Sequence, residues 1–347
     1  MNLRQLRRQA VSWSLGTRSP SLAGVIERLG FIQADPIRAP ARAQDLILRQ
    51  RVHGYRAGDL EAHYPSLALE EDVLYAYGFL SRPVWHWLAP RQQARLGKLE
   101  TRVLAQVLRD GETHPNALVD FGDARVVNAW GGYSKATKRA LEGLHARGLL
   151  RISRRENGIR IYAPATVRNA SLGTAERLSR LATVLVGIFA PAPEKTIRAM
   201  VARLSRAFPD AEPRRVLPTL VETGVLTRAA IDDTAYLWPT EQALTDEDQP
   251  EVRLLAPFDP VVWDRTRFEQ LWGWAYRFEA YTPIEKRVRG YYALPLLWRS
   301  DVIGWANVQL VDGELAVDLG FVGKRPRDRG FSSELDAELE RLRAFLT

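Results

Sequence analysis

Gln33 and Asp35 are a polar pair that could do chemistry, because a single residue separates them in the mostly apolar segment GFIQADP. A carboxylate can stabilise a developing positive charge and accept a proton from water, and an amide can hold that water. Side chains alternate along a β-strand, so the pair would share one face while Ile32 and Ala34 share the other. A structural interpretation is also open, in which Asp35 forms a side-chain turn before Pro36 and Gln33 lies on a strand surface.

The net charge favours a polyanionic partner. The 347 residues include 49 lysines and arginines against 41 acidic residues, which gives +8 at neutral pH, and the isoelectric point is near 9.8. Six of these cations are lysines and 43 are arginines, whose planar guanidinium groups suit bidentate contacts to phosphate. An Ala-, Leu- and Arg-rich composition is equally typical of a protein from a G·C-rich genome, so charge alone does not decide the partner.

The composition argues against several other classes of protein. The chain has no cysteine, which excludes disulfides and thiolate metal sites, and its five histidines are not spaced as metal ligands. No apolar run approaches the length of a transmembrane helix, and the N-terminal segment lacks the apolar core of a signal peptide. We therefore expect a cytoplasmic protein that has no metal, no cofactor and no membrane-spanning segment.

A helix followed by a basic hairpin is predicted between residues 130 and 163. Ser134 is a favourable N-cap, apolar residues from Ala136 to Leu144 mark one helical face, and Gly148 ends the helix. The strands LLRIS and IRIYA then flank an Asn-Gly turn, which is the pattern of a winged helix-turn-helix. Its basic residues are Lys135, Lys138 and Arg139 on the exposed face of the recognition helix, and Arg154, Arg155 and Arg160 on or near the wing.

The same pattern recurs at residues 216–238, and a weaker copy lies at residues 21–35. The turn of the 216–238 copy, IDDT, has no basic residue, so we interpret that copy as a scaffold. In the copy nearest the N-terminus, Gln33 and Asp35 would fall on the strand that leaves the recognition helix. Three tandem winged helices are therefore expected.

From about residue 251 the pattern becomes that of a small antiparallel β-barrel or sheet. We expect helices at 264–272 and 333–346 and strands near 275–282, 290–298, 302–311 and 314–320. The predicted fold class is α+β, with three tandem winged helix-turn-helix motifs followed by a small C-terminal β-barrel. The predicted domains are 1–100, which carries the Gln-x-Asp motif, 101–168 and 169–248, which are the second and third winged helices, and 249–347, the barrel with its terminal helix.

Three stretches, in this order, resemble the winged-helix DNA glycosylases of the YcaQ/AlkZ type. They are GFIQADPIRAPARAQDLILRQR, NAWGGYSKATKRALEGLHARGLLRISRRENGIRIY and LLAPFDPVVWDRTRFEQLWGWAYRFEAYTPIEKRVRGYYALP, and the resemblance covers nearly the whole chain. It implies three winged helices and a β-barrel around a concave DNA channel, and hydrolysis of alkylated purines from DNA, including interstrand crosslinks. The family signature is Gln, a usually hydrophobic residue, then Asp or Gln, which implies that Gln33 and Asp35 are catalytic.

Two positions depart from the family pattern. Many members carry a His pair shortly after the signature, where this chain has Gln44-Asp45, and the residue within the signature is the small Ala34. These departures bear on the range of substrates more than on the type of reaction.

The residues and the resemblance together predict a monofunctional DNA glycosylase of base excision repair. A guanine alkylated at N7 is already cationic, so its departure needs little acid assistance, and one carboxylate with one water-holding amide could suffice. No lysine near the motif could act as a Schiff-base nucleophile. The expected partner is double-stranded DNA with alkylated purines, bound by a monomer. The predicted DNA-binding residues are Arg38, Arg42, Lys135, Lys138, Arg139, Arg154, Arg155, Lys286, Arg287 and Arg289.

Two other functions stay open at this stage. A winged-helix transcriptional regulator without enzymatic activity would bind selected sequences, typically as a symmetric dimer, and would be indifferent to lesions. A scaffold for protein partners would show no salt-dependent affinity for DNA. The sequence has no heptad pattern or obvious dimerisation helix, which favours a monomer with an asymmetric channel.

Overall fold

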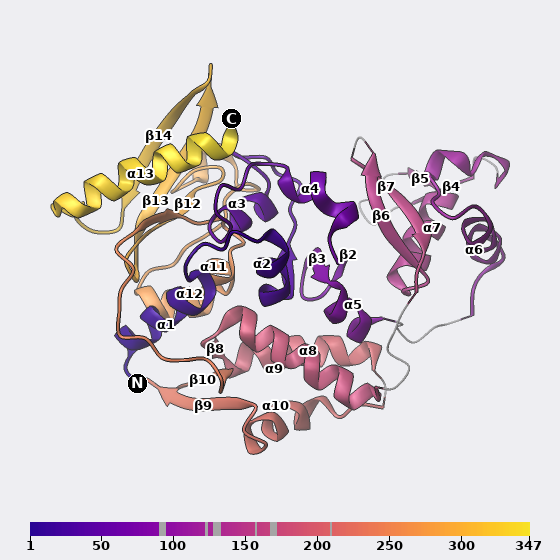
Figure 1. Cartoon of the computed structure of the whole chain (residues 1–347), viewed down its shortest axis with the longest axis horizontal. Helices are drawn as coiled ribbons and strands as arrows, with labels where there is room; N and C mark the ends of the chain where they lie inside the picture. The colour runs from indigo at the N-terminus through magenta and orange to yellow at the C-terminus, as the bar shows by residue number, and fades with distance from the viewer. Residues whose placement is uncertain (90–94, 122–123, 128–132, 157, 167–171, 209) are drawn as a thin grey trace.

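Three units that combine helices with a small sheet, followed by a C-terminal sheet, make up this α+β protein (Figure 1). The computed structural model describes residues 1–89, 95–121, 124–127, 133–156, 158–166, 172–208 and 210–347. Asn157 of the predicted Asn-Gly turn and part of the NAWGGYSK stretch lie outside these residues. The first unit occupies the middle of the view, between the second unit on one side and the C-terminal unit on the other, and the third unit lies below it (Figure 1).

The first unit, residues 22–88, carries Gln33. It contains α2 (Leu22–Leu29), β1 (Phe31–Gln33), α3 (Ala43–Arg49), α4 (Asp59–His63), β2 (Leu69–Val73), β3 (Tyr77–Ser81) and α5 (Arg82–Leu88). Its antiparallel sheet has the order β1-β3-β2. As predicted, the strand that carries Gln33 follows a helix, α2, but it ends before Asp35 and pairs with β3, and the hairpin of this unit is β2–β3. Pro36 and Pro40, just beyond β1, prevent that strand from continuing.

The second unit, residues 98–164, contains the predicted helix and hairpin. Its elements are α6 (Lys98–Asp110), β4 (Arg125–Val127), β5 (Tyr133–Lys135), α7 (Ala136–Ala146), β6 (Leu150–Glu156) and β7 (Ile159–Pro164). Lys135 occupies the N-cap position of α7, so the predicted Ser134 cap is wrong by one residue. Gly148 follows the helix with φ of 73°, a left-handed conformation that favours glycine. Thr113 forms an antiparallel bridge with Tyr162 beside the hairpin.

The third unit, residues 174–239, has the same strand order as the first. It contains α8 (Thr174–Phe189), β8 (Ala192–Pro193), α9 (Glu194–Leu204), α10 (Pro213–Glu222), β9 (Leu226–Ile231) and β10 (Thr234–Pro239). The sheet order is β8-β10-β9, so the short strand that precedes the helices pairs with the last strand, as in the first unit. Asp232 and Asp233 form the β9–β10 turn with positive φ values of 45° and 59°.

The C-terminal unit, residues 252–346, is an open four-stranded antiparallel sheet flanked by helices. Its elements are β11 (Val252–Leu254), α11 (Pro260–Trp263), α12 (Arg265–Trp272), β12 (Leu294–Trp298), β13 (Asp301–Val311), β14 (Glu314–Phe321) and α13 (Arg329–Leu346). The order β11-β12-β13-β14 leaves β11 and β14 at its edges, so the described strands form no closed barrel. Residues 275–282, predicted as a strand, form none, and α12 begins after the Asp264 cap. Helix α1 (Leu3–Leu15) packs on this unit, with Leu6 beside Phe268 in one apolar cluster.

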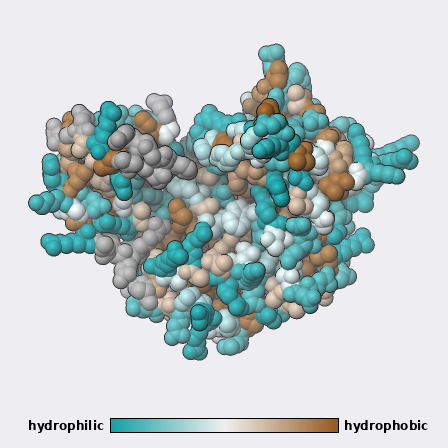
Figure 2. Space-filling view, turned by 180° about the vertical axis from the view of Figure 1, so that it is seen from behind, coloured by the Kyte–Doolittle hydropathy of each residue, from teal (hydrophilic) through white to brown (hydrophobic). Residues whose placement is uncertain are grey.

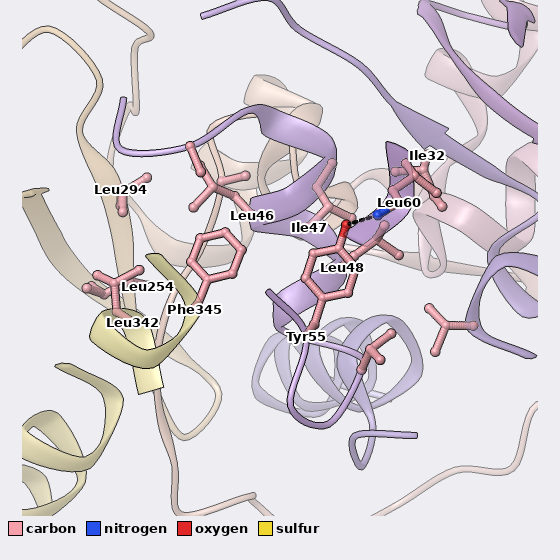
Figure 3. Packing of buried hydrophobic residues seen from close by; sticks show 14 of the residues in the cluster. Ile32, Leu46, Ile47, Leu48, Tyr55, Leu60, Leu254, Leu294, Leu342 and Phe345 are labelled. Atoms are coloured by element: carbon pink, nitrogen blue, oxygen red, sulfur yellow. Dashed lines mark hydrogen bonds between the residues drawn. The ribbon is translucent and has the colours of Figure 1, made fainter. Parts of the chain in front are cut away.

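One apolar core joins the first unit to the C-terminal unit and fixes β1 and α3 in place (Figure 3). Ile32 of β1 and Leu46 of α3 lie in the same cluster as Leu254, Leu294 and Phe345 of the C-terminal unit. Burial of such side chains stabilises the fold by roughly 1.5–3 kcal/mol each. This core therefore holds β1, the strand that carries Gln33, in a fixed position.

Two buried ion pairs reinforce the same contact. Arg51 donates to both carboxylate oxygens of Asp259, at 2.7 and 3.0 Å, and both side chains are fully buried. Arg49 donates to Glu338 at 3.0 Å. Arg49 and Arg51, which follow the Gln-x-Asp motif in the sequence, therefore have a structural role.

None of the helices in the described residues is long and apolar enough to span a membrane.

Candidate active site

Gln33 lies where β3 approaches β1 closely. Its partner in the antiparallel register is Gly78, at which a Cβ would lie 2.2 Å from the carbonyl oxygen of Ile32. A side chain at Gly78 would push the strands apart, so the sequence needs glycine there. Gln33 is buried, and its Oε1 has no hydrogen-bond partner within the described part of the chain.

Asp35 lies beyond the end of β1 and not on the strand itself. The Ala34 N–H donates to the Tyr77 carbonyl at 3.0 Å, and the Ile37 N–H donates to Asp35 Oδ1 at 2.9 Å. The side-chain turn of the structural interpretation is therefore formed. It uses one carboxylate oxygen, and among the described residues no hydrogen bond reaches Oδ2. The turn and a chemical role are compatible, because the turn fixes Asp35 while one oxygen stays available.

Gln44, on the first turn of α3, supports the loop that carries Asp35. Its Oε1 accepts a hydrogen bond from the Asp35 N–H at 3.4 Å. Asp45, the next residue, is engaged elsewhere: its Oδ1 accepts from the Tyr55 hydroxyl at 2.6 Å and from the Gly58 N–H at 3.2 Å. Of the two residues that replace the family's His pair, Gln44 is thus the one next to Asp35.

A cavity of about 280 Å³ opens beside Asp35. Its lining residues are Ala34, Asp35, Pro36, Arg42, Gln44, Glu61, Tyr77 and Phe79 of the first unit, with Arg155 and Arg160 of the second. Arg155 donates to both oxygens of the buried Glu71, at 2.9 and 2.6 Å, and the Arg160 guanidinium lies 4.8 Å from the Tyr77 ring centroid. The β6–β7 hairpin therefore forms one wall of the cavity.

Burial raises the pKa of Asp35, and the hydrogen bond from the Ile37 N–H opposes that rise. Tyr292, in the C-terminal unit, is close enough that the charge of Asp35 adds to burial in raising the pKa of the phenol. The hydroxyl of Tyr292 is buried without a hydrogen-bond partner among the described residues. The site thus holds a carboxylate in a poorly solvated setting, which makes it a better proton acceptor than an exposed aspartate.

The predicted DNA-binding residues near the motif have different surroundings. Arg38 is exposed. Arg42 lines the cavity and forms an ion pair with Glu61. Of this pair, Arg38 is the better suited to reach a phosphate.

In the second unit, Lys135, Lys138 and Arg139 are exposed at the start of α7. Arg154 forms ion pairs of 3.0 Å with Glu112 and Glu156. Arg155, in the cavity wall, forms an ion pair with Glu71. The cations at the start of α7 are exposed, as predicted, and both wing arginines form ion pairs with carboxylates.

The segment of the C-terminal unit that carries Lys286, Arg287 and Arg289 is held in place by a carboxylate and by backbone carbonyls. Glu279 accepts hydrogen bonds from three successive backbone N–H groups, those of Val288, Arg289 and Gly290. The guanidinium groups of Arg287 and Arg289 donate to backbone carbonyls at 2.8 and 2.6 Å, and that of Arg289 also lies near the rings of Trp274 and Trp305. Lys286 is exposed, as are the apolar side chains of Tyr281, Ile284 and Val288.

The structure adds residues that sequence reasoning did not assign to the site. Tyr77 and Tyr292 come from segments distant in sequence, and neither carries a local signal. Arg160 was assigned to the wing, but its place in the cavity wall depends on how the second unit docks. For Gln44 the sequence does contain a signal, because it stands where many members of the family that the sequence resembles carry a histidine.

Within the described ranges, no three His, Cys, Asp or Glu side chains are grouped so as to hold a metal ion.

The chain is similar to a known protein family and to a solved structure. A family model described as "DNA glycosylase AlkZ-like" matches residues 26–345. The structure of the DNA glycosylase AlkZ of Streptomyces sahachiroi matches with a TM-score of 0.64 and 15% sequence identity, over 99% of this chain and 97% of that chain. At this identity the second match establishes the fold.

Proposed function

Since this chain belongs to the AlkZ-like DNA glycosylase family and is therefore a DNA repair glycosylase, we propose that it is monofunctional and hydrolyses the N-glycosidic bond of cationic N7-alkylated purines. The observation that carries this proposal is Asp35, a half-buried carboxylate with one oxygen free of hydrogen bonds from the described residues, beside a cavity. Nitrogen-mustard interstrand crosslinks, which also join cationic N7-alkylguanines, are included among the proposed substrates.

The proposed reaction begins with departure of the alkylated base, which leaves an electron-poor sugar resembling an oxocarbenium ion. Asp35 stabilises this sugar and accepts a proton from the attacking water. At roughly 4 Å and an effective dielectric of about 20, one charge pair is worth about 4 kcal/mol, or about a thousandfold in rate if it acts in the transition state alone. Glutamine amides supply the remaining groups: the buried Gln33 Oε1 can accept a hydrogen bond from water, and Gln44 holds the loop that carries Asp35.

The monofunctional character of the enzyme is proposed from the cavity lining. The described residues that line the Asp35 cavity include arginines but no lysine, and arginine cannot form the Schiff base that a lyase needs. The cleaved base would therefore leave an intact abasic site.

We also interpret the three helix-and-sheet units as winged helices acting in one monomer. The first and third share the strand order in which a short leading strand pairs with the last strand of the hairpin, and the Thr113–Tyr162 bridge is the counterpart in the second. The domain division at residues 1–100, 101–168, 169–248 and 249–347 belongs to the same proposal.

The test is base release under single-turnover conditions. Purified protein is incubated with duplex DNA carrying N7-methylguanine, and with a nitrogen-mustard crosslink, and the free base and heat-labile abasic sites are measured. Wild-type protein should release the base and leave the strand uncut before heating. Failure on both substrates would refute the proposed substrate class.

A further inference from the structure

A second cavity, of about 830 Å³, lies against the third unit. Its lining includes Lys195, Arg198 and Arg203 of α9, Tyr75 of the β2–β3 turn, Trp263 and Gln270. The β9–β10 turn has no basic residue, and for that reason the sequence predicted a scaffold role for this unit. The cations come instead from α9.

The exposed residues Lys195, Arg198, Ala199, Ala202 and Arg203 form the α9 surface. Their spacing follows the helical repeat, so they share one face, while the opposite face, with Ile197 and Leu204 among others, is buried in the core of the third unit. The two alanines between the cations leave room for close approach by a bulky partner.

The charges on this surface favour an anion. Glu194 lines the cavity as well, but it is paired with Arg198 and, at 2.8 Å, with Arg228. Within the part of the chain that the structure describes, Lys195 and Arg203 have no carboxylate partner, and Asp233 adds one acidic group to the lining. A cationic alkylated base would be repelled here, whereas a phosphate would be attracted.

This cavity is a near neighbour of Asp35. Tyr75 lines it, and Tyr77, two residues further along the chain, lines the Asp35 cavity. Two residues of extended chain span at most about 7 Å. The Tyr75 ring is also packed against Phe31 of β1, with 4.7 Å between centroids, and against Trp263 at 4.9 Å. A duplex carries one phosphate charge per about 1.7 Å of its axis, so DNA engaged at Asp35 also presents phosphates to neighbouring surfaces of the protein.

We propose that the α9 surface binds the DNA backbone next to the lesion, with Lys195 and Arg203 each neutralising a phosphate. The proposal rests on the proposed function, because it takes duplex DNA engaged at Asp35 as the ligand. The third unit then holds DNA through a helix face, and this contact supplies affinity without touching the reacting atoms.

The test compares Lys195→Ala/Arg203→Ala with wild type on an undamaged fluorescent duplex across a series of salt concentrations. Each lost phosphate contact should make the slope of log K against log salt less steep by about 1, so the double variant should change by about 2. The matched control is Lys324→Ala/Arg327→Ala, two exposed cations between β14 and α13, at the other side of the view from α9 (Figure 1). Its slope should equal that of wild type.

A second measurement locates the contact. Single phosphates near an N7-methylguanine are replaced by neutral methylphosphonates, and wild type should lose affinity at positions where the double variant is indifferent. An unchanged salt slope, an equal change in the control, or identical methylphosphonate profiles would overturn the inference. Binding to undamaged DNA requires no catalysis, so failure of this inference is separate from failure of the proposed reaction.

Discussion

Asp35 and Asp45 show how the surroundings of a carboxylate decide what it can do. Asp45 is buried and bound by the Tyr55 hydroxyl and the Gly58 N–H, so it stabilises the chain around α3 and α4. Asp35 gives one oxygen to a turn and lies beside a cavity. The Gln-x-Asp spacing identified Asp35 in the sequence as a candidate. Two features of Asp35 could not be predicted from the sequence: that it is half-buried, and that it lies beyond the end of β1 and not on the strand.

Asp35→Asn is expected to slow single-turnover base release about a hundredfold or more, because the amide cannot stabilise a cationic sugar or accept a proton from water. Burial raises the pKa of Asp35 above its ordinary value of 3.8. The contribution of this group to stability is therefore complete below pH 3.8 and is lost as the pH rises through the raised pKa. At neutral pH the variant should melt at the wild-type temperature or slightly above it.

The pH dependence of the rate provides the control for this prediction. The ionised carboxylate is the active form, so the wild-type rate should rise with pH, with a midpoint above 3.8 that the variant lacks. If Asp35→Asn released the base at the wild-type rate, the role of Asp35 would be limited to forming the turn before Pro36.

Gln44→Ala should reduce base release about fivefold, since it removes a hydrogen bond worth about 1 kcal/mol that steadies the Asp35 loop. Gln44→Glu keeps the acceptor but adds a negative charge near Asp35. That charge should raise the pKa of Asp35 and move the acidic limb of the rate profile to higher pH. Unchanged rates and midpoints in both variants would show that Gln44 only fills space.

Single elements were the most predictable level of this fold. Helical spacing and a terminal glycine correctly predicted α7 and the β6–β7 hairpin, and Asp264 caps α12 at the expected place. The failures involve pairing between distant segments. Local pattern could not reveal that β1 pairs with β3, and the apolar residues at 275–282 pack as loop, with Tyr276 buried in the core of the C-terminal unit.

Docking of the β6–β7 hairpin depends on Glu70 and Glu71, two consecutive acidic residues of β2, whereas the next residue, Asp72, bonds to α5 of the first unit. Glu70 accepts hydrogen bonds from Arg151, Glu71 accepts them from Arg155, and Asp72 accepts one from the Trp85 indole at 3.1 Å. The Glu71 backbone carbonyl also accepts from His145 at 2.7 Å. A run of acidic residues is typical of a solvated surface, but here Glu70 and Glu71 are buried and pair with arginines of the second unit.

Glu71→Gln is therefore expected to loosen the second unit, because it leaves Arg155 and Arg160 without their carboxylate. Breaking such a buried pair costs about 3 kcal/mol. Hydrogen exchange should increase in β2 and β6, and base release should fall although Asp35 is intact. Glu156→Gln, on the exposed end of the same hairpin, is the matched control and should change neither measurement. Equal exchange in the two variants would contradict the role of Glu71.

At the scale of the whole molecule, segments far apart in sequence combine to form the site. Asp35 belongs to the first unit, the cavity wall to the second, and Tyr292 to the C-terminal unit. Hydrophilic side chains surround a paler central region on the rear face (Figure 2). Contacts between the units depend on side chains such as Arg51, whose partner Asp259 lies far away in the sequence.

Arg51 and Asp259 make that long-range assembly testable. Besides Asp259, Arg51 donates to the Ser14 carbonyl and the Ile47 carbonyl, so one guanidinium joins α1, α3 and the C-terminal unit. Asp259→Asn keeps the shape of the side chain but leaves a buried cation without its counter-charge. We expect the free energy of unfolding to fall by roughly 3–5 kcal/mol. Urea unfolding at fixed pH measures this change.

The control for Asp259→Asn is Asp301→Asn. Asp301 forms an ion pair of 3.0 Å with Arg7, but its side chain is 57% exposed. An exposed pair is worth less than about 1 kcal/mol because water solvates both charges, so this variant should unfold close to wild type. A loss from Asp259→Asn no larger than the loss from Asp301→Asn would show that the apolar core between the first and C-terminal units holds the site together without the buried charges.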